Sequence, residues 1–372
     1  MKASNIILYS AMRDYGHMIN KITFEAGEAA GLTKDDFTCE NCFYDLSGKK
    51  PIEGVLLVEE KEGLVTLTTD WFLCRFPFMI KGMGKAEGIV ISRATADKIL
   101  LEHGDWFGYY QEDGVNYRLY APERSSGARP LILYLHGGGG SGDDNEMQLT
   151  DTMGPIKLAE RCPDMFVMAP QAPGGGMSME EALKRMRSKG DPFRVILGQD
   201  PDNEFDARGW TRWYLAKVAQ IIRNMIDEGL VDPRRVYVTG LSMGGCGTLK
   251  IMSVAPDLFA AALPVCPSMN GETWPILNQL PNIPTMILAS YIDHSNSRHA
   301  YILRAVQKLW KEGRKDVEFY LFTQEELSAY GIGTTKGLSA QELYAENHNC
   351  WILAYHNEMC CLDWLFSHVK GM

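Results

Sequence analysis

The chain has 372 residues, of which 45% are hydrophobic, and a formal net charge of −10. That length is natural for two domains, and that hydrophobic content is sufficient for a large buried core. A negative net charge without a basic stripe argues against the counterion release that drives nucleic-acid binding, so we expect no nucleic-acid partner.

The N-terminus offers only a short apolar patch, Ile6–Leu8, which Arg13 and Asp14 soon interrupt. No run approaches the length of a membrane helix, so we expect neither a signal peptide nor a membrane association. The nine cysteines, an odd number, favour reduced thiols and a cytoplasmic location. A secreted protein remains the alternative if a leader was removed ahead of Met1.

Short β-like segments separated by turn residues fill the first hundred positions, and no helical period is found before Ala94. The segments are Ile19–Phe24, Val55–Val58, Leu64–Leu67 and Gly88–Ile91. They predict a small all-β sandwich over residues 1–104, followed by a second domain over residues 105–372. The residues leave the role of this first domain open. It could join copies of the chain into a homo-oligomer, or it could form a wall of the active-site cleft.

Cys39 and Cys42 form a Cys-x-x-Cys pair in this first part. A metal or redox site would need a second pair or a following helix, and the sequence has neither. We therefore interpret the two residues as unpaired thiols and expect no metal.

From Trp106 onward, strand-like and helix-like segments alternate. A hairpin with an Asp-Gly turn is predicted for Trp106–Tyr110 and Val115–Tyr120. The further strands are Leu131–Leu135, Phe166–Ala169, Val236–Val238, Ala261–Val265, Pro284–Ala289 and Val317–Leu321, and the helices lie around Leu215–Met225, Cys246–Val254, Ser297–Lys311 and Glu358–His368. This alternation predicts an α/β domain with a doubly wound, mainly parallel sheet.

Residues 174–213 look like an insertion into this pattern. The segment opens with three glycines and carries a polar helix, Met179–Ser188. Because ligand sites in such sheets gather at the C-terminal ends of strands, the insertion is a candidate lid or pocket wall. A solvated surface segment is the alternative.

The run from Val236 to Gly245 has the pattern Gly-x-Ser-x-Gly, centred on Ser242. A buried strand precedes the serine, a helix follows it, and the flanking Gly240 and Gly244 permit a sharp turn between them. This is the nucleophile elbow of α/β-hydrolases, so we interpret Ser242 as a nucleophile. A strand-to-helix turn without chemistry is the alternative.

The strand Leu131–Leu135 ends in His136 and four glycines, Gly137–Gly140. Glycines let backbone N–H groups face a ligand, which is what an oxyanion hole requires. The loop is therefore a candidate oxyanion hole, with a merely flexible loop as the alternative.

A serine nucleophile needs a general base, and in this fold the chain order is Ser, then Asp or Glu, then His. His348 is the best candidate base because it follows the last strand in a polar loop, whereas His294 and His299 fall too early. A surface histidine is the alternative reading of His348.

Asp293 is the candidate acid, because it comes just after the strand Pro284–Ala289. Asp316 and Glu318 suit the role less well, since they lie before and within a strand. The alternative role of Asp293 is to cap the following helix.

These motifs resemble the predicted-peptidase and feruloyl-esterase-like branch of the α/β-hydrolases, which borders the polyhydroxybutyrate depolymerase-like esterases. The residues that carry the resemblance are Leu135–Asn145, Pro170–Pro173, Val231–Gly245, His348–Trp351, Tyr355 and Asp363–Leu365. The branch usually has a His-Gly pair ahead of its acid, whereas here Asp293 follows Ala289-Ser290-Tyr291-Ile292.

The resemblance implies Ser242 as nucleophile, Asp293 as acid and His348 as base, with the N–H groups of Gly138 and Met243 forming the oxyanion hole. It also implies an immunoglobulin-like N-terminal domain. We expect a serine esterase that forms an acyl-enzyme and needs no metal or organic cofactor.

The substrate is expected to be a small-molecule or oligomeric ester: feruloyl, acetyl, other aryl or short-chain esters, polyesters included. Gln171, Trp210 and Trp351 are the candidates for substrate contacts, although buried tryptophan more often belongs to the core. A serine peptidase that acts on small peptides and a non-catalytic binding protein with a hydrolase fold are the alternative functions.

Overall fold

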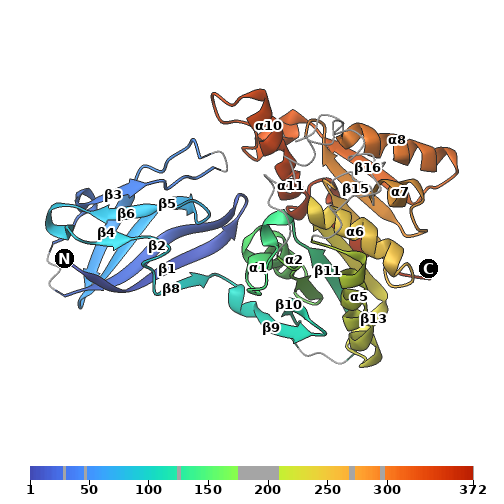
Figure 1. Cartoon of the computed structure of the whole chain (residues 1–372), viewed down its shortest axis with the longest axis horizontal. Helices are drawn as coiled ribbons and strands as arrows, with labels where there is room; N and C mark the ends of the chain where they lie inside the picture. Colours follow the sequence, from blue (N-terminus) through green and yellow to red (C-terminus); the bar gives the residue numbers. More distant parts are fainter. Residues whose placement is uncertain are drawn as a thin grey trace. The chain divides into compact units, whose positions relative to one another are not determined.

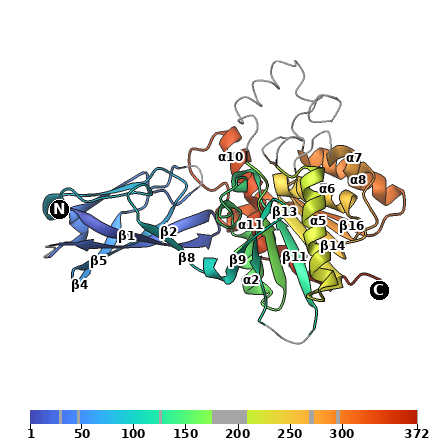
Figure 2. The ribbon, with the colours of Figure 1, turned by 60° about the horizontal axis from the view of Figure 1, so that its bottom comes forward.

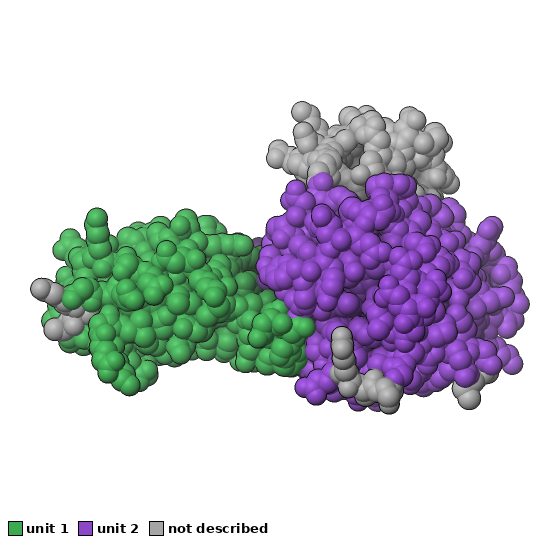
Figure 3. Space-filling model, turned by 90° about the horizontal axis from the view of Figure 1, so that it is seen from below, with its two compact units in different colours: residues 1–106 green, residues 107–372 purple. Residues whose placement is uncertain are grey.

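The computed structural model describes residues 1–27, 31–45, 48–123, 127–174, 209–267, 273–293 and 298–371. Two compact units make up the chain, residues 1–106 and residues 107–372 (Figure 3). The predicted boundary lay two residues earlier, after residue 104. Most of the proposed insertion, including the predicted helix Met179–Ser188 and the region's suggested lid, lies outside the described residues.

The first unit consists of two β-sheets together with short 3-10 helices. The five-stranded sheet has the order β4-β5-β2-β1-β8 and the three-stranded sheet the order β3-β6-β7. Their bounds are β1 Ala3–Arg13, β2 Gly16–Ala26, β3 Phe37–Glu40, β4 Val55–Lys61, β5 Leu64–Leu73, β6 Met79–Gly82, β7 Val90–Ile91 and β8 Lys98–Leu101, with 3-10 helices η1 Lys34–Asp36, η2 Gly84–Ala86 and η3 Gly104–Trp106.

A single hydrophobic cluster holds the two sheets of this unit together. It contains Leu8, Ile22 and Leu67 of the larger sheet and Phe37 and Ile80 of the smaller one. The unit is therefore all-β, with one core shared between two sheets, as expected of a β-sandwich.

The second unit is built on an eight-stranded sheet with the order β16-β15-β14-β13-β11-β12-β10-β9. The six strands from β16 to β12 run parallel, and β10 and β9 are added antiparallel at one edge. The bounds are β9 Phe107–Glu112, β10 Val115–Tyr120, β11 Arg129–Leu135, β12 Phe166–Pro170, β13 Val231–Leu241, β14 Ala261–Val265, β15 Thr285–Ser290 and β16 Val317–Phe322.

Helices are distributed in two groups around this sheet (Figures 1 and 2). One group contains successive neighbours α5 Arg212–Asp227, α6 Met243–Val254, α7 Thr273–Asn278 and α8 Arg298–Lys311. The other contains α2 Gly154–Arg161, α11 Trp351–Tyr355 and α12 Cys361–Ser367, in which α11 contacts both other helices. This confirms the doubly wound α/β architecture.

Smaller helical elements complete the second unit. They are η4 Gly138–Gly140, α1 Met147–Thr150, α9 Gln324–Ala329, α10 Ala340–Asn347, η6 His348–Cys350 and η7 Glu358–Cys360. Three of the predicted elements are corrected by this list. The segment around His348 is not a loop, because α10 runs directly into η6. The closing helix is broken, because Met359 and Cys360 have φ angles of +58° and +52° before α12 begins. The helix after Ser242 starts at Met243, three residues earlier than predicted.

Candidate active site

Ser242 stands at the sharp turn between β13 and α6. Its backbone has φ +55° and ψ −116°, a conformation that non-glycine residues rarely adopt. A Cβ on Gly244 would lie 1.9 Å from the carbonyl oxygen of Leu135, and one on Gly240 would lie 2.4 Å from that of Gly244. Both flanking glycines are therefore required for β13, β11 and α6 to meet closely enough to form this turn.

The three side chains predicted for the catalytic triad lie in one hydrogen-bonded row. His348 Nε2 is 2.8 Å from Ser242 Oγ, and His348 Nδ1 is 2.9 Å from Asp293 Oδ2. Asp293 is completely buried. An ionised carboxylate only accepts hydrogen bonds, so Nδ1 carries the proton and the lone pair of Nε2 faces the serine hydroxyl.

His348 is held where helix α10 passes into η6. The carbonyl of the preceding Asn347 accepts a short hydrogen bond from Ser290 Oγ, which ties this turn to the end of β15. The ring of Trp351 contacts the imidazole edge-on, with ring centroids 5.5 Å apart. The strand end that leads to Asp293 thus also fixes the backbone beside His348.

The glycine loop follows β11 and forms the 3-10 turn η4. Gly140 N–H donates to the carbonyl of Gly137 over 3.2 Å, which closes the turn. The position of a Cβ on Gly138 is open, with no heavy atom within 4 Å, whereas one on Gly139 would lie 2.0 Å from a carboxylate oxygen of Asp151. Met243 is the first residue of α6, so its N–H has no acceptor within that helix.

His136, the first residue of the glycine loop, makes contacts that the sequence pattern does not indicate. It is fully buried, its Nε2 accepts from the N–H of Ala172 over 2.9 Å, and its Nδ1 donates to the carbonyl of Gly137 over 2.6 Å. Burial lowers the pKa of His136 from 6.5 to about 4. The imidazole is therefore neutral and connects the glycine loop to the segment after β12.

The candidates for substrate contacts occupy different surroundings. Gln171 and Trp210 are each 1% exposed, and the indole N–H of Trp210 donates to the carbonyl of His136 over 3.0 Å. Both are therefore placed to support the glycine loop from within the core. Trp351 is half-buried beside His348. A further tryptophan, Trp213, is 67% exposed and lies against Lys217.

In the described part of the chain, no group of three or more histidine, cysteine or acidic side chains is arranged to hold a metal ion. None of its helices combines the length and the apolar character that crossing a membrane requires.

The mainly parallel sheet, the strained serine turn after its central strand and the glycine loop on the neighbouring strand define an α/β-hydrolase fold. The described features agree with a solved structure titled as a thermostable esterase, which aligns with 99% of this chain and 100% of its own at a TM-score of 0.64 and 19% identity. That likeness is one of fold.

Sequence comparisons match shorter stretches. Residues 203–301 match the model of the prolyl oligopeptidase family. Poly(3-hydroxyalkanoate) depolymerase C of Paucimonas lemoignei is 44% identical over 48 residues, which are 13% of this chain and 12% of the relative. Cutinase est1 of Thermobifida alba is 35% identical over 81 residues, which are 22% of this chain and 24% of the relative. The matches thus span between about an eighth and a quarter of these curated relatives.

Proposed function

We propose that the protein is a serine hydrolase that cleaves carboxylic esters, with Ser242 as nucleophile, His348 as general base and Asp293 as its acid partner. The observation that carries the proposal is the continuous row of two hydrogen bonds, 2.8 Å from Ser242 to His348 and 2.9 Å from His348 to Asp293. A serine hydroxyl is a weak nucleophile at neutral pH, and this arrangement supplies both the base and the group that orients it.

The reaction proceeds in two acyl-transfer steps. His348 Nε2 takes the hydroxyl proton as Ser242 Oγ attacks the ester carbonyl carbon, and His348 then returns this proton to the departing alcohol. Water, deprotonated by the same nitrogen, attacks the carbonyl carbon of the resulting acyl-enzyme. The bond to Ser242 Oγ breaks, His348 returns the proton to this oxygen, and the acid is released. Buried Asp293 stabilises the imidazolium that forms in each step.

The N–H groups of Gly138 and Met243 are the proposed donors to the oxyanion. The open space beside Gly138 leaves room for a substrate carbonyl, and the N-terminus of α6 places a free donor directly after the nucleophile. Removal of one such donor in a comparable site costs about 10²–10³-fold in kcat.

Short-chain and aryl esters, feruloyl and acetyl esters among them, are the proposed substrates, and polyesters are included. The names of two relatives, a poly(3-hydroxyalkanoate) depolymerase and a cutinase, support testing polyesters first. Clearing of suspended poly(3-hydroxybutyrate) and release of acid from p-nitrophenyl esters of increasing chain length would define the acyl preference.

A serine peptidase is the second candidate, because residues 203–301 match the prolyl oligopeptidase family. The same triad cleaves amides, so the distinction depends on the substrate. Parallel assays of p-nitrophenyl esters and of aminoacyl and dipeptidyl p-nitroanilides would separate the two. A ratio of kcat/KM that favours the anilides would replace the esterase proposal by the peptidase.

The direct test is turnover of p-nitrophenyl acetate and butyrate by wild type and by Ser242→Ala. We expect activity in the wild type and a loss of at least about 10³-fold in the variant. Equal rates in the two proteins would refute the proposal, and rates equal to that of buffer alone would favour a non-catalytic binding protein with this fold.

A further inference from the structure

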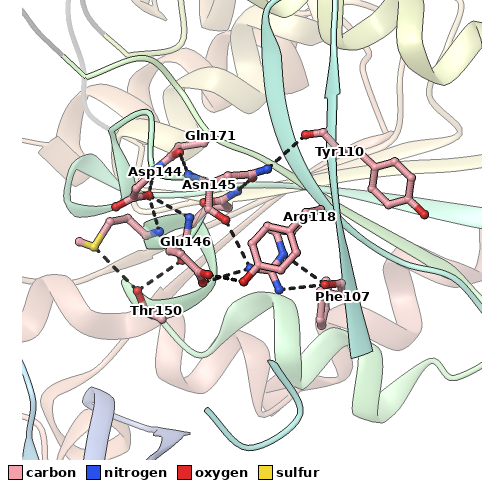
Figure 4. A network of polar contacts seen from close by, with 11 residues as sticks. Phe107, Tyr110, Arg118, Asp144, Asn145, Glu146, Thr150 and Gln171 are labelled. Carbon is pink, nitrogen blue, oxygen red and sulfur yellow. Dashed lines mark hydrogen bonds and ion pairs between the residues drawn. The ribbon is translucent and has the colours of Figure 1, made fainter. Parts of the chain in front are cut away.

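Every polar group of Gln171 is engaged with the protein, and Figure 4 shows its side chain beside Asp144 and Asn145. Its side-chain oxygen accepts from the N–H of Asn145 over 2.7 Å, and its Nε2 donates to Asp144 Oδ1 over 2.7 Å and to the carbonyl of Gly140 over 3.2 Å. Its backbone N–H donates to Asn116 over 2.8 Å, and its carbonyl accepts from the hydroxyl of Tyr214 over 2.6 Å. The amide is thus fixed in one orientation.

Gln171 and the residue after it make three hydrogen bonds to the glycine loop, and a fourth bond within the loop continues from them. Nε2 of Gln171 binds the carbonyl of Gly140, and the carbonyl of Ala172 accepts from Gly142 N–H over 3.0 Å. The N–H of Ala172 binds His136, which in turn holds the carbonyl of Gly137. The carbonyls at both ends of the 3-10 turn are therefore turned toward the interior, which sets the direction of the peptide planes between them.

Arg118 holds the chain shortly after the glycine loop, at Asn145 and Glu146. It is 2% exposed, and its guanidinium donates to the carbonyl of Phe107 over 2.8 Å and 3.2 Å, to Glu146 over 3.0 Å and to the carbonyl of Asn145 over 3.3 Å. The ring of Tyr109 covers the guanidinium, with its centroid 3.5 Å from the guanidinium carbon, and the Tyr109 hydroxyl also donates to Glu146. The backbone of Asn145, with φ +57°, is thereby held from both sides: its carbonyl accepts from Arg118 and its N–H donates to Gln171.

We propose that Gln171 is a positioning residue for oxyanion stabilisation. It holds the glycine loop in the orientation in which Gly138 offers its N–H to the reacting carbonyl, and Arg118 fixes the segment on which the amide of Gln171 rests. This inference rests on the proposed esterase function. It differs from the expectation that Gln171 contacts the substrate, because a buried and fully bonded amide has no group left for a ligand.

The first test is Gln171→Met, which keeps the length of the side chain and removes its hydrogen bonds. We expect kcat for p-nitrophenyl butyrate to fall about tenfold or more, less than for the complete loss of an oxyanion donor, while KM stays within about threefold. Affinity for an aryl trifluoromethyl ketone, whose adduct carries an oxyanion, should fall in parallel with kcat. Gln220→Met on the exposed face of α5 is the matched control and should leave both values unchanged.

The second test, Gln171→Glu, has a pH signature that a purely structural role would not produce. A carboxylate at this position would face Asp144, so its pKa rises, and only its protonated form can donate to Asp144 or Gly140. The ratio of kcat for this variant to that of the wild type should therefore increase as the pH falls from 8 to 5. Use of this ratio removes every pH dependence that the two proteins share.

The outcomes separate the two proposals. If the wild type hydrolyses no ester, or Ser242→Ala matches it, the function itself is wrong. If the wild type is active and Gln171→Met keeps its kcat, raises only KM or loses kcat without losing ketone affinity, the positioning role is wrong. Should Gln171→Met fail to fold, a flat pH ratio for Gln171→Glu overturns the inference in the same way.

Discussion

The neutral, buried His136 makes the second unit sensitive to acid. Its two ring nitrogens are both used inside the protein, one to accept from Ala172 and one to donate to Gly137. A proton on Nε2 would face the N–H of Ala172 in place of a lone pair, and the charge would have no contact with water. Protonation therefore requires the glycine loop to open.

The size of the effect follows from the shift in pKa from 6.5 to about 4. Because the folded-state value lies below the unfolded one, the unfolded chain binds more protons between about pH 4 and pH 6.5. The contribution of His136 to the free energy of unfolding is thus complete above pH 6.5 and is lost as the pH falls toward 4. Between pH 7.5 and pH 5 the loss is about 2 kcal/mol.

The assay is urea unfolding of the wild type and of His136→Gln, which does not titrate, at pH 7.5 and pH 5. Tryptophan fluorescence reports on this site because the ring of Trp210 lies 4.7 Å from that of His136. From pH 7.5 to pH 5, the free energy of unfolding of the wild type should fall by about 2 kcal/mol more than that of the variant. Burial also lowers the pKa of His17, in the first unit, but both proteins contain that residue and its effect cancels.

If the difference in the free energy of unfolding between wild type and His136→Gln is the same at pH 7.5 and pH 5, His136 is not the source of the acid sensitivity. An NMR titration of the His136 ring with a midpoint near 6.5 would also refute this reasoning, since it would show that the histidine reaches water in the folded protein.

Two further substitutions test the packing of the elbow and the cap of a helix. Gly244→Ala would place a Cβ 1.9 Å from the Leu135 carbonyl oxygen. We therefore expect the free energy of unfolding, measured by thermal denaturation, to fall by about 3 kcal/mol and the activity to be lost. Gly27→Ala is the control and should be neutral, because no atom lies within 4 Å of its Cβ position. Ser339→Ala removes the cap of α10, in which Ser339 and Glu342 bond reciprocally, and should cost about 1 kcal/mol by chemical denaturation; no change would contradict the cap.

Local signals made the central part of the site predictable from the sequence. Strand β14 has the predicted bounds Ala261–Val265, and the hairpin turn Asp113-Gly114 has positive φ at both residues, as an Asp-Gly hairpin requires. The elbow around Ser242 is likewise specified by adjacent residues, because the strand, the glycines and the helix are consecutive.

Elements that depend on distant partners were missed. The sequence predicts only a short apolar patch where strand β1 lies, because β1 is stabilised by pairing of Leu8 with Ile22 on one side and with Ile99 on the other. The role of His136 depends on Ala172, 36 positions later. Both require contacts that no window of neighbouring residues contains.

Helix α10 is a different kind of miss, because its signal was present. The pattern Ser339-x-x-Glu342 is a capping box, and the same pattern at Thr323-x-x-Glu326 starts α9. The capping box of Ser339 predicts a helix that begins after this residue, and a helix of ordinary length from there would end close to His348. The choice of His348 itself depended on chain order and does not change with this correction.

Activation of the Ser242 hydroxyl by His348 is the step on which the proposed reaction depends. A fluorophosphonate probe, followed by intact mass and peptide mapping, measures this directly. We predict one adduct, on Ser242, that is absent in Ser242→Ala and forms far more slowly in His348→Ala. A folded wild-type protein that takes up no probe, or that carries the adduct on another residue, would contradict the account.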